Sequence, residues 1–233
     1  MVQVNAHHAS CADARVPGGL ACSDNATMRT PSTAPSPEAC IAATREWLEK
    51  AVIGLNLCPF AKAVHVKNQI RYVVSSATTP EALQAELADE LRWLAAADPQ
   101  ETDTTLLIHP QVLQDFLDYN DFLDVVDATV ADTEVEGVLQ VASFHPDYQF
   151  AGTAPGDITN HTNRSPYPIL HLLREDSVSR AVQGHPSPES IPEANIARLR
   201  ALGHEGWAAL GIPRPAEHCP AHGQGPGRPE SGT

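Results

Sequence analysis

Short apolar runs rich in β-branched residues alternate along this chain with helical patterns that begin at a Ser-Pro-Glu or Thr-Pro-Glu sequence. The clearest runs are residues 70–75, 104–108 and 138–144. Ser or Thr followed directly by Pro is typical of a helix N-terminus. The backbone N–H groups of the first turn have no partner within the helix, so Pro, which has no N–H, costs nothing there. Strands that alternate with helices through short connections favour a sheet covered by helices. We therefore expect an α/β fold, with α+β as the alternative.

The apolar spacing predicts about five helices around a sheet of three or four strands. The expected helices run from Ser36 to the break at Pro59, from Thr79 to about Asp98, over residues 112–131, from Ser165 to about Gln183, and over residues 191–210. A fourth strand is expected at residues 148–153, folding back beside the third. The region contains no internal repeat or linker, so residues 36–211 are predicted to form a single globular domain.

The two ends of the chain differ from this central region. Residues 1–35 and 212–233 are polar or rich in Pro and Gly and show no apolar periodicity, so both are expected to be disordered tails. No segment resembles a secretory signal or a run of about 18 apolar residues, which favours a soluble, cytoplasmic protein that does not enter a membrane. Met28 is an alternative start of translation. An odd number of cysteines without framework spacing indicates free thiols at Cys40 and Cys58.

The net charge of −14 comes from one part of the chain. Residues 81–136 hold fifteen Asp or Glu and one basic residue, Arg92, so this region alone accounts for the imbalance. A basic stripe typical of nucleic-acid binding is absent, and nucleic acid is not expected as a partner. The acidic region is interpreted as a solvated face on two helices, and a docking surface for a basic protein partner stays open.

Residues 144–174 have the composition of a functional segment. Histidines, arginines, aspartates and tyrosines are interleaved there with turn-forming Gly and Pro, whereas a plain connection usually carries small polar residues. The segment leaves the end of the strand at 138–144 and leads to an expected helix N-terminus. Proteins with α/β folds often bind ligands at that position.

The helix expected from Ser165 to Gln183 predicts how some of these residues meet. Tyr167, His171, Arg174 and Val178 are spaced i, i+4, i+7 and i+11, so on a helix they would share one face. Leu170, Leu173 and Ala181 would share the face that packs into the core. If the polar face looks toward the preceding loop, Arg164, His145 and Asp147 would complete a cleft.

Three strings in the chain are specific enough to indicate a family. GLNLCPFA, VLQVASFHPDYQFAG and NRSPYPILHLLRE resemble a bacterial family catalogued as a domain of unknown function, number 1415 in that series. The resemblance covers most of residues 40–210. It implies a shared fold and a shared site but names no activity, so the chemistry is argued from the residues.

The favoured interpretation is a small enzyme that moves protons on a low-molecular-weight anion. Imidazole beside carboxylate and guanidinium groups suits acid–base chemistry on a substrate that Arg holds by charge-assisted hydrogen bonds. The predicted catalytic residues are His145, His171, Asp147, His161 and Tyr167, and the predicted substrate-binding residues are Arg164, Arg174, Tyr148 and Asn163. The structural alternative is that the arginines pair with Asp147, Asp157 or Glu175 and only hold the loop.

Other chemistries stay open or lose support. A metal-dependent enzyme that uses the His and Asp residues remains an alternative, although the spacing fits no familiar metal signature. Cys58 ends a helical run, so a buried structural thiol is the better interpretation. Walker A, G-x-G-x-x-G and G-x-S-x-G motifs are absent, so no nucleotide cofactor is indicated. A non-catalytic protein that binds a ligand or docks a partner through the same cleft is the second functional class.

Overall fold

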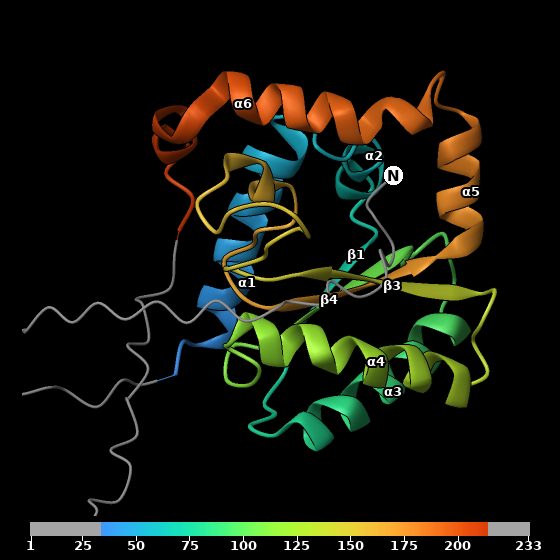
Figure 1. Ribbon diagram of the computed structural model, residues 1–233. Helices are drawn as coiled ribbons and strands as arrows, with labels where there is room; N and C mark the ends of the chain where they lie inside the picture. Colours follow the sequence, from blue (N-terminus) through green and yellow to red (C-terminus); the bar gives the residue numbers. More distant parts are fainter. Residues whose placement is uncertain (1–33, 214–233) are drawn as a thin grey trace, which may run out of the picture.

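The computed structural model describes residues 34–213, which form one mixed sheet with helices packed on both of its faces (Figure 1). This arrangement confirms the predicted α/β class with a single domain. The predictions made for residues 1–33 and 214–233, including Met28 as a start, lie outside the described residues. Among the residues that are described, no helix is both long and apolar enough to cross a membrane.

The sheet has four strands in the order β1-β2-β4-β3. The strands are β1 Ile70–Val74, β2 Thr104–Ile108, β3 Leu139–Phe144 and β4 Ile169–Arg174. Strand β2 runs parallel to β1, and β4 runs antiparallel to both β2 and β3. Strands β1, β2 and β3 therefore point the same way, and their carboxyl ends share one edge of the sheet.

Two predictions are wrong. The helix expected from Ser165 begins only at Glu175, and the fourth strand is β4 at residues 169–174 rather than a strand at residues 148–153. Pro166 and Pro168 fix φ, remove two N–H donors and push the residues before them away from the helical region. The next six residues then pair on both sides as a central strand, and the helix begins only at Glu175. A strand buried on both faces is almost uniformly apolar, so its sequence does not show the two-residue alternation that would distinguish it from a helix.

The helices are α1 Pro37–Trp47, α2 Ala61–Val66, α3 Pro80–Ala96, α4 Phe116–Asp132, α5 Glu175–Gln183 and α6 Ile191–Ala209. Helix α1 continues as the π-helical segment η1 Leu48–Ile53, and short 3₁₀ turns occur at η2 Ile158–Thr162 and η3 Pro188–Ser190. The side chains of Ser36 and Thr79 accept hydrogen bonds from the backbone N–H groups of Ala39 and Ala82, which confirms both predicted caps. Helix α4 begins at Phe116 rather than at 112, because the Asp115 carboxylate caps it.

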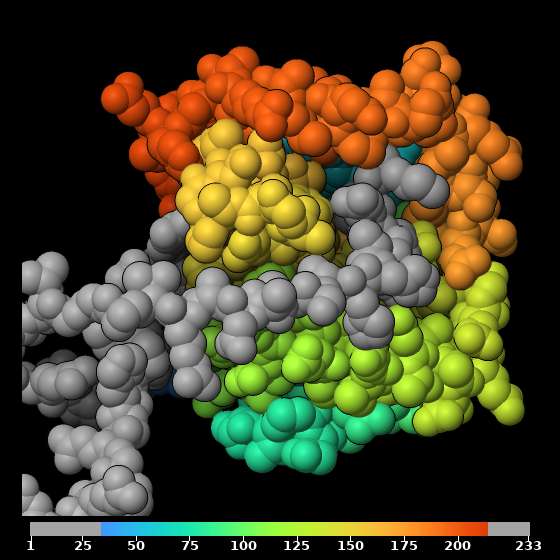
Figure 2. All heavy atoms as spheres, in the orientation of Figure 1, coloured from blue at the N-terminus to red at the C-terminus, as the bar shows by residue number. Residues whose placement is uncertain are grey.

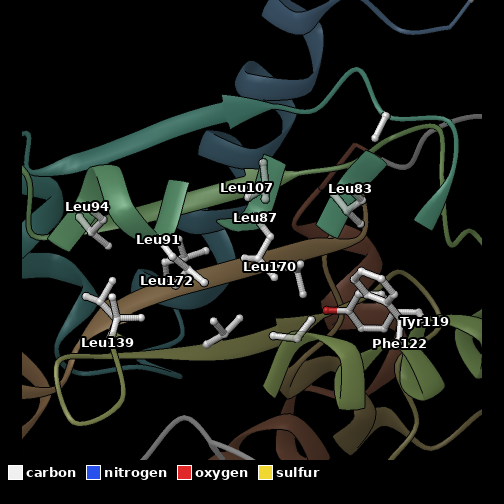
Figure 3. Close-up of a cluster of buried hydrophobic side chains, with 14 of the residues drawn as sticks. Leu83, Leu87, Leu91, Leu94, Leu107, Tyr119, Phe122, Leu139, Leu170 and Leu172 are labelled. Carbon is white, nitrogen blue, oxygen red and sulfur yellow. The ribbon is translucent and has the colours of Figure 1, made fainter. Parts of the chain in front are cut away.

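Each face of the sheet has its own core. On one face, Leu83, Leu87, Leu91 and Leu94 of α3 meet Tyr119 and Phe122 of α4 over Leu107, Leu139, Leu170 and Leu172 of the sheet (Figure 3). On the other face, α1 packs Cys40, Ala43 and Trp47 against Leu106, Ile108, Ala142, Phe144 and Ile169. Helix α6 lies over the segment between β3 and β4 on this second side (Figure 1).

The outer sides of α3 and α4 carry the acidic region. Asp118, Asp121, Asp124 and Asp127 of α4 are all exposed. This placement agrees with the interpretation of a solvated acidic face. The segment between β3 and β4 forms a compact mass that fills the space between α6 and α4 (Figure 2, yellow).

Candidate functional site

The predicted polar helix face does not exist, because residues 169–174 form a strand. Successive side chains of a strand point to opposite faces of the sheet, so His171 and Arg174 lie on different sides. Leu170, expected to oppose His171 on a helix, shares the α3 side of the sheet with Arg174. The hypothesis that Tyr167, His171 and Arg174 line one cleft is therefore wrong.

Arg174 is buried and links the central strand to the end of α3. Its Nη2 donates hydrogen bonds to the carbonyl oxygens of Leu94 at 2.7 Å and Ala97 at 2.8 Å, and its Nε donates to the Thr102 carbonyl at 3.3 Å. The Leu94 carbonyl also accepts the Ala97 N–H at 3.2 Å, and Ala97 directly follows α3, so Arg174 completes the hydrogen bonding at this helix end. This geometry favours a structural role for Arg174 over substrate binding.

His171 lies on the opposite face, next to β2. Its Nε2 is 2.7 Å from the Thr104 hydroxyl oxygen. That hydroxyl donates its proton to the Leu172 carbonyl, so it can only accept from His171, and Nε2 is the protonated ring nitrogen. Burial lowers the pKa of His171 to about 4. The ring is therefore neutral at neutral pH and is held by a neighbouring strand, which fits packing better than proton transfer.

His145 is also buried, directly after β3. Its Nε2 lies 3.2 Å from the Leu113 carbonyl, and its Nδ1 accepts the Asp147 backbone N–H at 3.0 Å. Burial lowers the pKa of His145, against the opposing effect of the Asp147 carboxylate. Both ring nitrogens have partners, and neither partner is the carboxylate of Asp147, which is an exposed residue. The pair thus shapes a turn, and a catalytic role for it stays a prediction that this geometry does not favour.

A second buried histidine, which the sequence reasoning missed, lies beside His145. His109 follows β2 as His145 follows β3, and both imidazole rings contact the ring of Tyr119 at the carboxyl ends of these strands. The His109 ring stacks on Tyr119 with centroids 5.6 Å apart, and burial lowers its pKa to about 4. Its Nε2 has no hydrogen-bond partner among the described residues. The sequence did contain a signal for this residue, because a His directly follows each of the two apolar runs that form β2 and β3.

Three further predicted residues hold the loop in place. Tyr167 contacts the Cys40 thiol, and burial raises its pKa to about 12. Asn163 is buried and donates from Nδ2 to the Ser143 carbonyl at 3.1 Å. Tyr148 packs against other aromatic rings, and burial raises its pKa. These contacts are those of a folded loop rather than of groups directed at a ligand.

His161 and Arg164, the remaining two predicted residues, do come together at a cavity. We call this space of about 330 Å³ the tryptophan cavity. Its lining consists of Trp47, Pro146, His161, Arg164, Ser165, Pro166, His204, Trp207, Ala208, Ile212 and Pro213. The cavity lies where α1, the loop after β3 and the end of α6 meet.

Arg164 is positioned by the loop that it closes. Its Nε donates to the Tyr148 carbonyl at 3.0 Å, and its Nη2 donates to the Pro155 carbonyl at 2.7 Å. Both acceptors are backbone carbonyls, and they fix the orientation of the guanidinium at the cavity. The side chain therefore combines the two roles that the sequence left open, a clasp of the loop and a cation at the cavity.

Aromatic rings form two walls of the tryptophan cavity. The His161 imidazole lies against the Trp207 indole with centroids 4.1 Å apart and planes inclined by 36°. Trp47 packs edge-on against Phe144, and its indole Nε1 is buried with no hydrogen-bond partner among the described residues. A buried N–H without an acceptor is unusual in a folded protein and is commonly satisfied by a ligand or water.

The last turns of α6 reach this cavity because the helix is broken at Gly203. That residue has φ +65° and ψ 178°, a conformation open essentially only to glycine. His204 and Trp207 follow the break and line the cavity. The sequence reasoning missed both residues, since they lie far from the 144–174 window and on what was expected to be one regular helix.

Three basic side chains, His161, Arg164 and His204, line the tryptophan cavity, and the Asp157 carboxylate lies near them outside the lining. The Asp157 pKa is lowered mainly by hydrogen bonds from the Thr159 N–H and hydroxyl, with smaller contributions from Arg200 and His204 of α6. Arg200 and His204 therefore lie close to the same loop as Arg164. Together these side chains favour an anion over a cation.

The described residues include no group of three His, Cys, Asp or Glu placed to hold one metal ion. His161 and His204 are the cavity's imidazoles, and no carboxylate or thiolate lines the cavity beside them. The Cys58 thiol is largely buried, and burial raises its pKa. These observations supply no donor set for the metal-dependent alternative and no activated thiol nucleophile.

Comparisons with known proteins give one finding. Curated proteins and solved structures yielded no match. A family model described as a protein of unknown function, DUF1415, matches residues 39–209, a range that contains every strand and nearly every helical residue described above. The chain belongs to the DUF1415 family.

Proposed function

We propose that the protein binds a small organic anion in the tryptophan cavity and transfers protons on it through His161 and His204. The observation that carries this proposal is the convergence of His161, Arg164 and His204 between Trp47 and Trp207 in one cavity. The three basic side chains come from two distant parts of the chain. Their meeting is therefore a product of the fold and not of local composition.

The cavity offers a charged donor and apolar aromatic walls to an organic anion. The Arg164 guanidinium is held at the lining by two neutral carbonyls, and a charge-assisted hydrogen bond contributes about 1.5–3 kcal/mol. The Trp47 indole N–H has no acceptor among the described residues, but it is fully buried and is not exposed to the cavity, so it is not counted as a donor to the anion. The indole rings add an apolar wall, so an anion attached to a small apolar body fits better than an inorganic ion.

The two imidazoles differ in their surroundings, which suits an acid and a base. His161 is buried with its ring tilted against Trp207, whereas His204 is exposed to solvent. Proton transfer by a positioned side chain contributes about 10²–10⁴-fold to a rate. The substrate class is thus an organic anion with a proton that moves during the reaction.

A ligand-binding protein without turnover is the second candidate. The observation in its favour is the clasp made by Arg164, because a guanidinium that holds a loop can bind an anion and couple its binding to the order of that loop. Both candidates use the same cavity, and they differ only in whether the ligand is changed.

Binding is tested first, by thermal unfolding with acetate, benzoate, phosphate and sulfate. We expect the organic acids to raise the melting temperature in a saturable manner. Ala208→Trp should abolish this stabilisation by filling the cavity, whereas Ala209→Trp, an equally exposed neighbour outside the lining, should retain it. Equal stabilisation of both variants, or none in the wild type, would contradict the proposal.

Turnover separates the two candidates. Each organic acid that stabilises the protein is incubated with a hundredth of its concentration of protein, and the mixture is followed by proton NMR in D₂O, where solvent exchange or conversion is visible. An enzyme should convert the acid or exchange one of its carbon-bound protons, and His204→Gln should slow that process about 100-fold with little change in KM. An unchanged ligand that still binds supports the binding protein.

A further inference from the structure

A second and larger cavity lies at the opposite edge of the sheet, where β1 and β2 begin. It has a volume of about 630 Å³ and lies between α2 and α5, so we call it the α2–α5 cavity. It has no lining residue in common with the tryptophan cavity. Its volume is within the range of small-molecule sites. An inference about this cavity is therefore independent of the proposed function.

The walls of the α2–α5 cavity are apolar and include one aromatic ring. Phe60, Val64 and Val178 contribute to the lining from the two helical sides. The Phe60 ring meets the His185 ring edge-on, with centroids 6.1 Å apart and planes at 83°, which fixes its orientation. A fixed, partly exposed aromatic ring favours a flat ring system as the partner.

The inner part of the cavity presents an acceptor. Gln69 is 8% exposed, and its Nε2 donates to the carbonyl oxygens of Pro99 and Gln100 at 3.3 and 2.7 Å. Because both partners are acceptors, they fix which end of the amide carries the nitrogen. Its Oε1 accepts no hydrogen bond from the described residues and is not among their fully buried unpaired atoms, so a donor on a ligand in the cavity can reach it.

The mouth of the cavity is basic. Lys67 and Arg180 are exposed and line it from opposite helices. Arg180 donates to the Ser177 hydroxyl at 2.9 Å, and that hydroxyl donates to the Asp103 carboxylate, so α5 is tied to the start of β2. Two cations against one carboxylate give the lining a net positive charge in a protein whose net charge is −14.

We propose that the α2–α5 cavity binds a flat aromatic acid that carries an N–H donor. The ring system lies against Phe60 and the aliphatic walls, the N–H donates to the Gln69 Oε1, and the anionic group lies near Lys67 and Arg180. Each part of this ligand contacts a different feature of the cavity, so ligands that lack one part test each contact separately.

Three probes test the proposal by titration calorimetry with the full chain. Indole-3-acetate has the ring, the N–H and the carboxylate; naphthalene-1-acetate lacks the N–H; and indole lacks the carboxylate. We expect saturable binding of indole-3-acetate, about fivefold or more weaker binding of naphthalene-1-acetate, and weaker binding of indole with no dependence on salt.

Variants then locate the bound acid. Lys67→Glu should weaken indole-3-acetate about threefold or more, whereas Lys62→Glu, the same charge change at an exposed position of α2 outside the lining, should leave affinity unchanged. Val178→Trp, which fills the α2–α5 cavity, should abolish binding when it is combined with Ala208→Trp to close the tryptophan cavity as well, and the far-ultraviolet circular dichroism of the double variant should match the wild type. Ala208→Trp, which fills the tryptophan cavity, should leave binding intact.

Several outcomes would overturn this inference. They are no saturable binding of indole-3-acetate, equal affinity for naphthalene-1-acetate, equal losses in Lys62→Glu and Lys67→Glu, or loss in Ala208→Trp with retention in Val178→Trp. The last outcome would place the acid in the tryptophan cavity and would support the proposed function. Loss of organic-acid stabilisation in Ala208→Trp alone tests only that function and leaves the α2–α5 cavity unaffected.

Discussion

At the residue scale, the partners of a side chain decide its role more than its type does. Arg164 and Arg174 lie ten residues apart and were both expected to anchor a substrate. Arg164 lines a cavity, while Arg174 is buried against the carbonyls that end α3. The same contrast separates His161, which lines the tryptophan cavity, from His171, which is bonded to the next strand. None of the residues that bond to these side chains is a sequence neighbour of the residue it contacts.

Replacing Arg174 should therefore affect stability and not ligand binding. Arg174→Met leaves the Ala97 carbonyl without a donor and the Leu94 carbonyl with only the Ala97 N–H, so we expect a loss of about 2–4 kcal/mol in unfolding free energy. Arg92→Met, at an exposed position of α3, should cost less than about 0.5 kcal/mol. Urea denaturation of both variants measures the difference. Similar midpoints for the two would show that the buried guanidinium is not needed.

At the element scale, interruptions of regular structure position the tryptophan cavity. Pro166 and Pro168 prevent a helix and deliver the chain into β4, which leaves the preceding loop in place over the sheet. The break at Gly203 turns the end of α6 toward that loop. The two interruptions depend on residues with opposite backbone properties. Pro is restricted to a narrow range of φ, whereas Gly readily adopts positive φ.

Gly203→Ala tests the second interruption. A Cβ at this position meets no atom within 4 Å, so any cost comes from the backbone conformation alone, about 1–3 kcal/mol. We also expect weaker organic-acid stabilisation, since His204 and Trp207 follow the break. Gly184→Ala is the control, because its φ of −78° is open to any residue. Melting temperatures and tryptophan fluorescence report the two effects, and a Gly203→Ala protein as stable as the wild type would contradict the assignment.

At the scale of the whole molecule, neutral histidines are distributed through the interior while acidic residues cover α3 and α4. His109, His145 and His171 all have a lowered pKa because of burial. The exposed aspartates of α4 face solvent, and whether they also dock a basic partner stays a prediction. The buried histidines link stability to pH.

Stability should fall as the pH drops through the range from about 6.5 to 4. His109 and His171 have a pKa of about 4 in the folded chain and 6.5 as the ordinary value, so in this range the unfolded chain binds more protons. Two such groups give a slope of at most about 2.7 kcal/mol per pH unit. His109→Asn, which keeps a donor for the Val112 carbonyl, should reduce that slope by up to half. Unfolding midpoints measured between pH 7.5 and 4.5 test this, and a slope unchanged in His109→Asn would refute it.

The sequence by itself determined the features that depend on local chemistry. The caps at Ser36 and Thr79, the strand Thr104–Ile108 and the third strand up to Phe144 all follow from neighbouring residues. The family also followed from three strings of the chain. The density of polar residues in 144–174 predicted a site there; two of its residues, His161 and Arg164, line a cavity, and a functional role for that cavity stays a prediction.

Only the tertiary structure decided the identity of β4 and the composition of that cavity. An apolar run such as ILHLLR satisfies both helical and strand patterns, and pairing with β2 and β3 on either side selects the strand. That selection separated His171 from Arg174. The tryptophan cavity needed Trp47 from α1 and His204 and Trp207 from α6, residues more than 150 positions apart. Contacts over such separations depend on the packing of whole elements, which local sequence patterns do not encode.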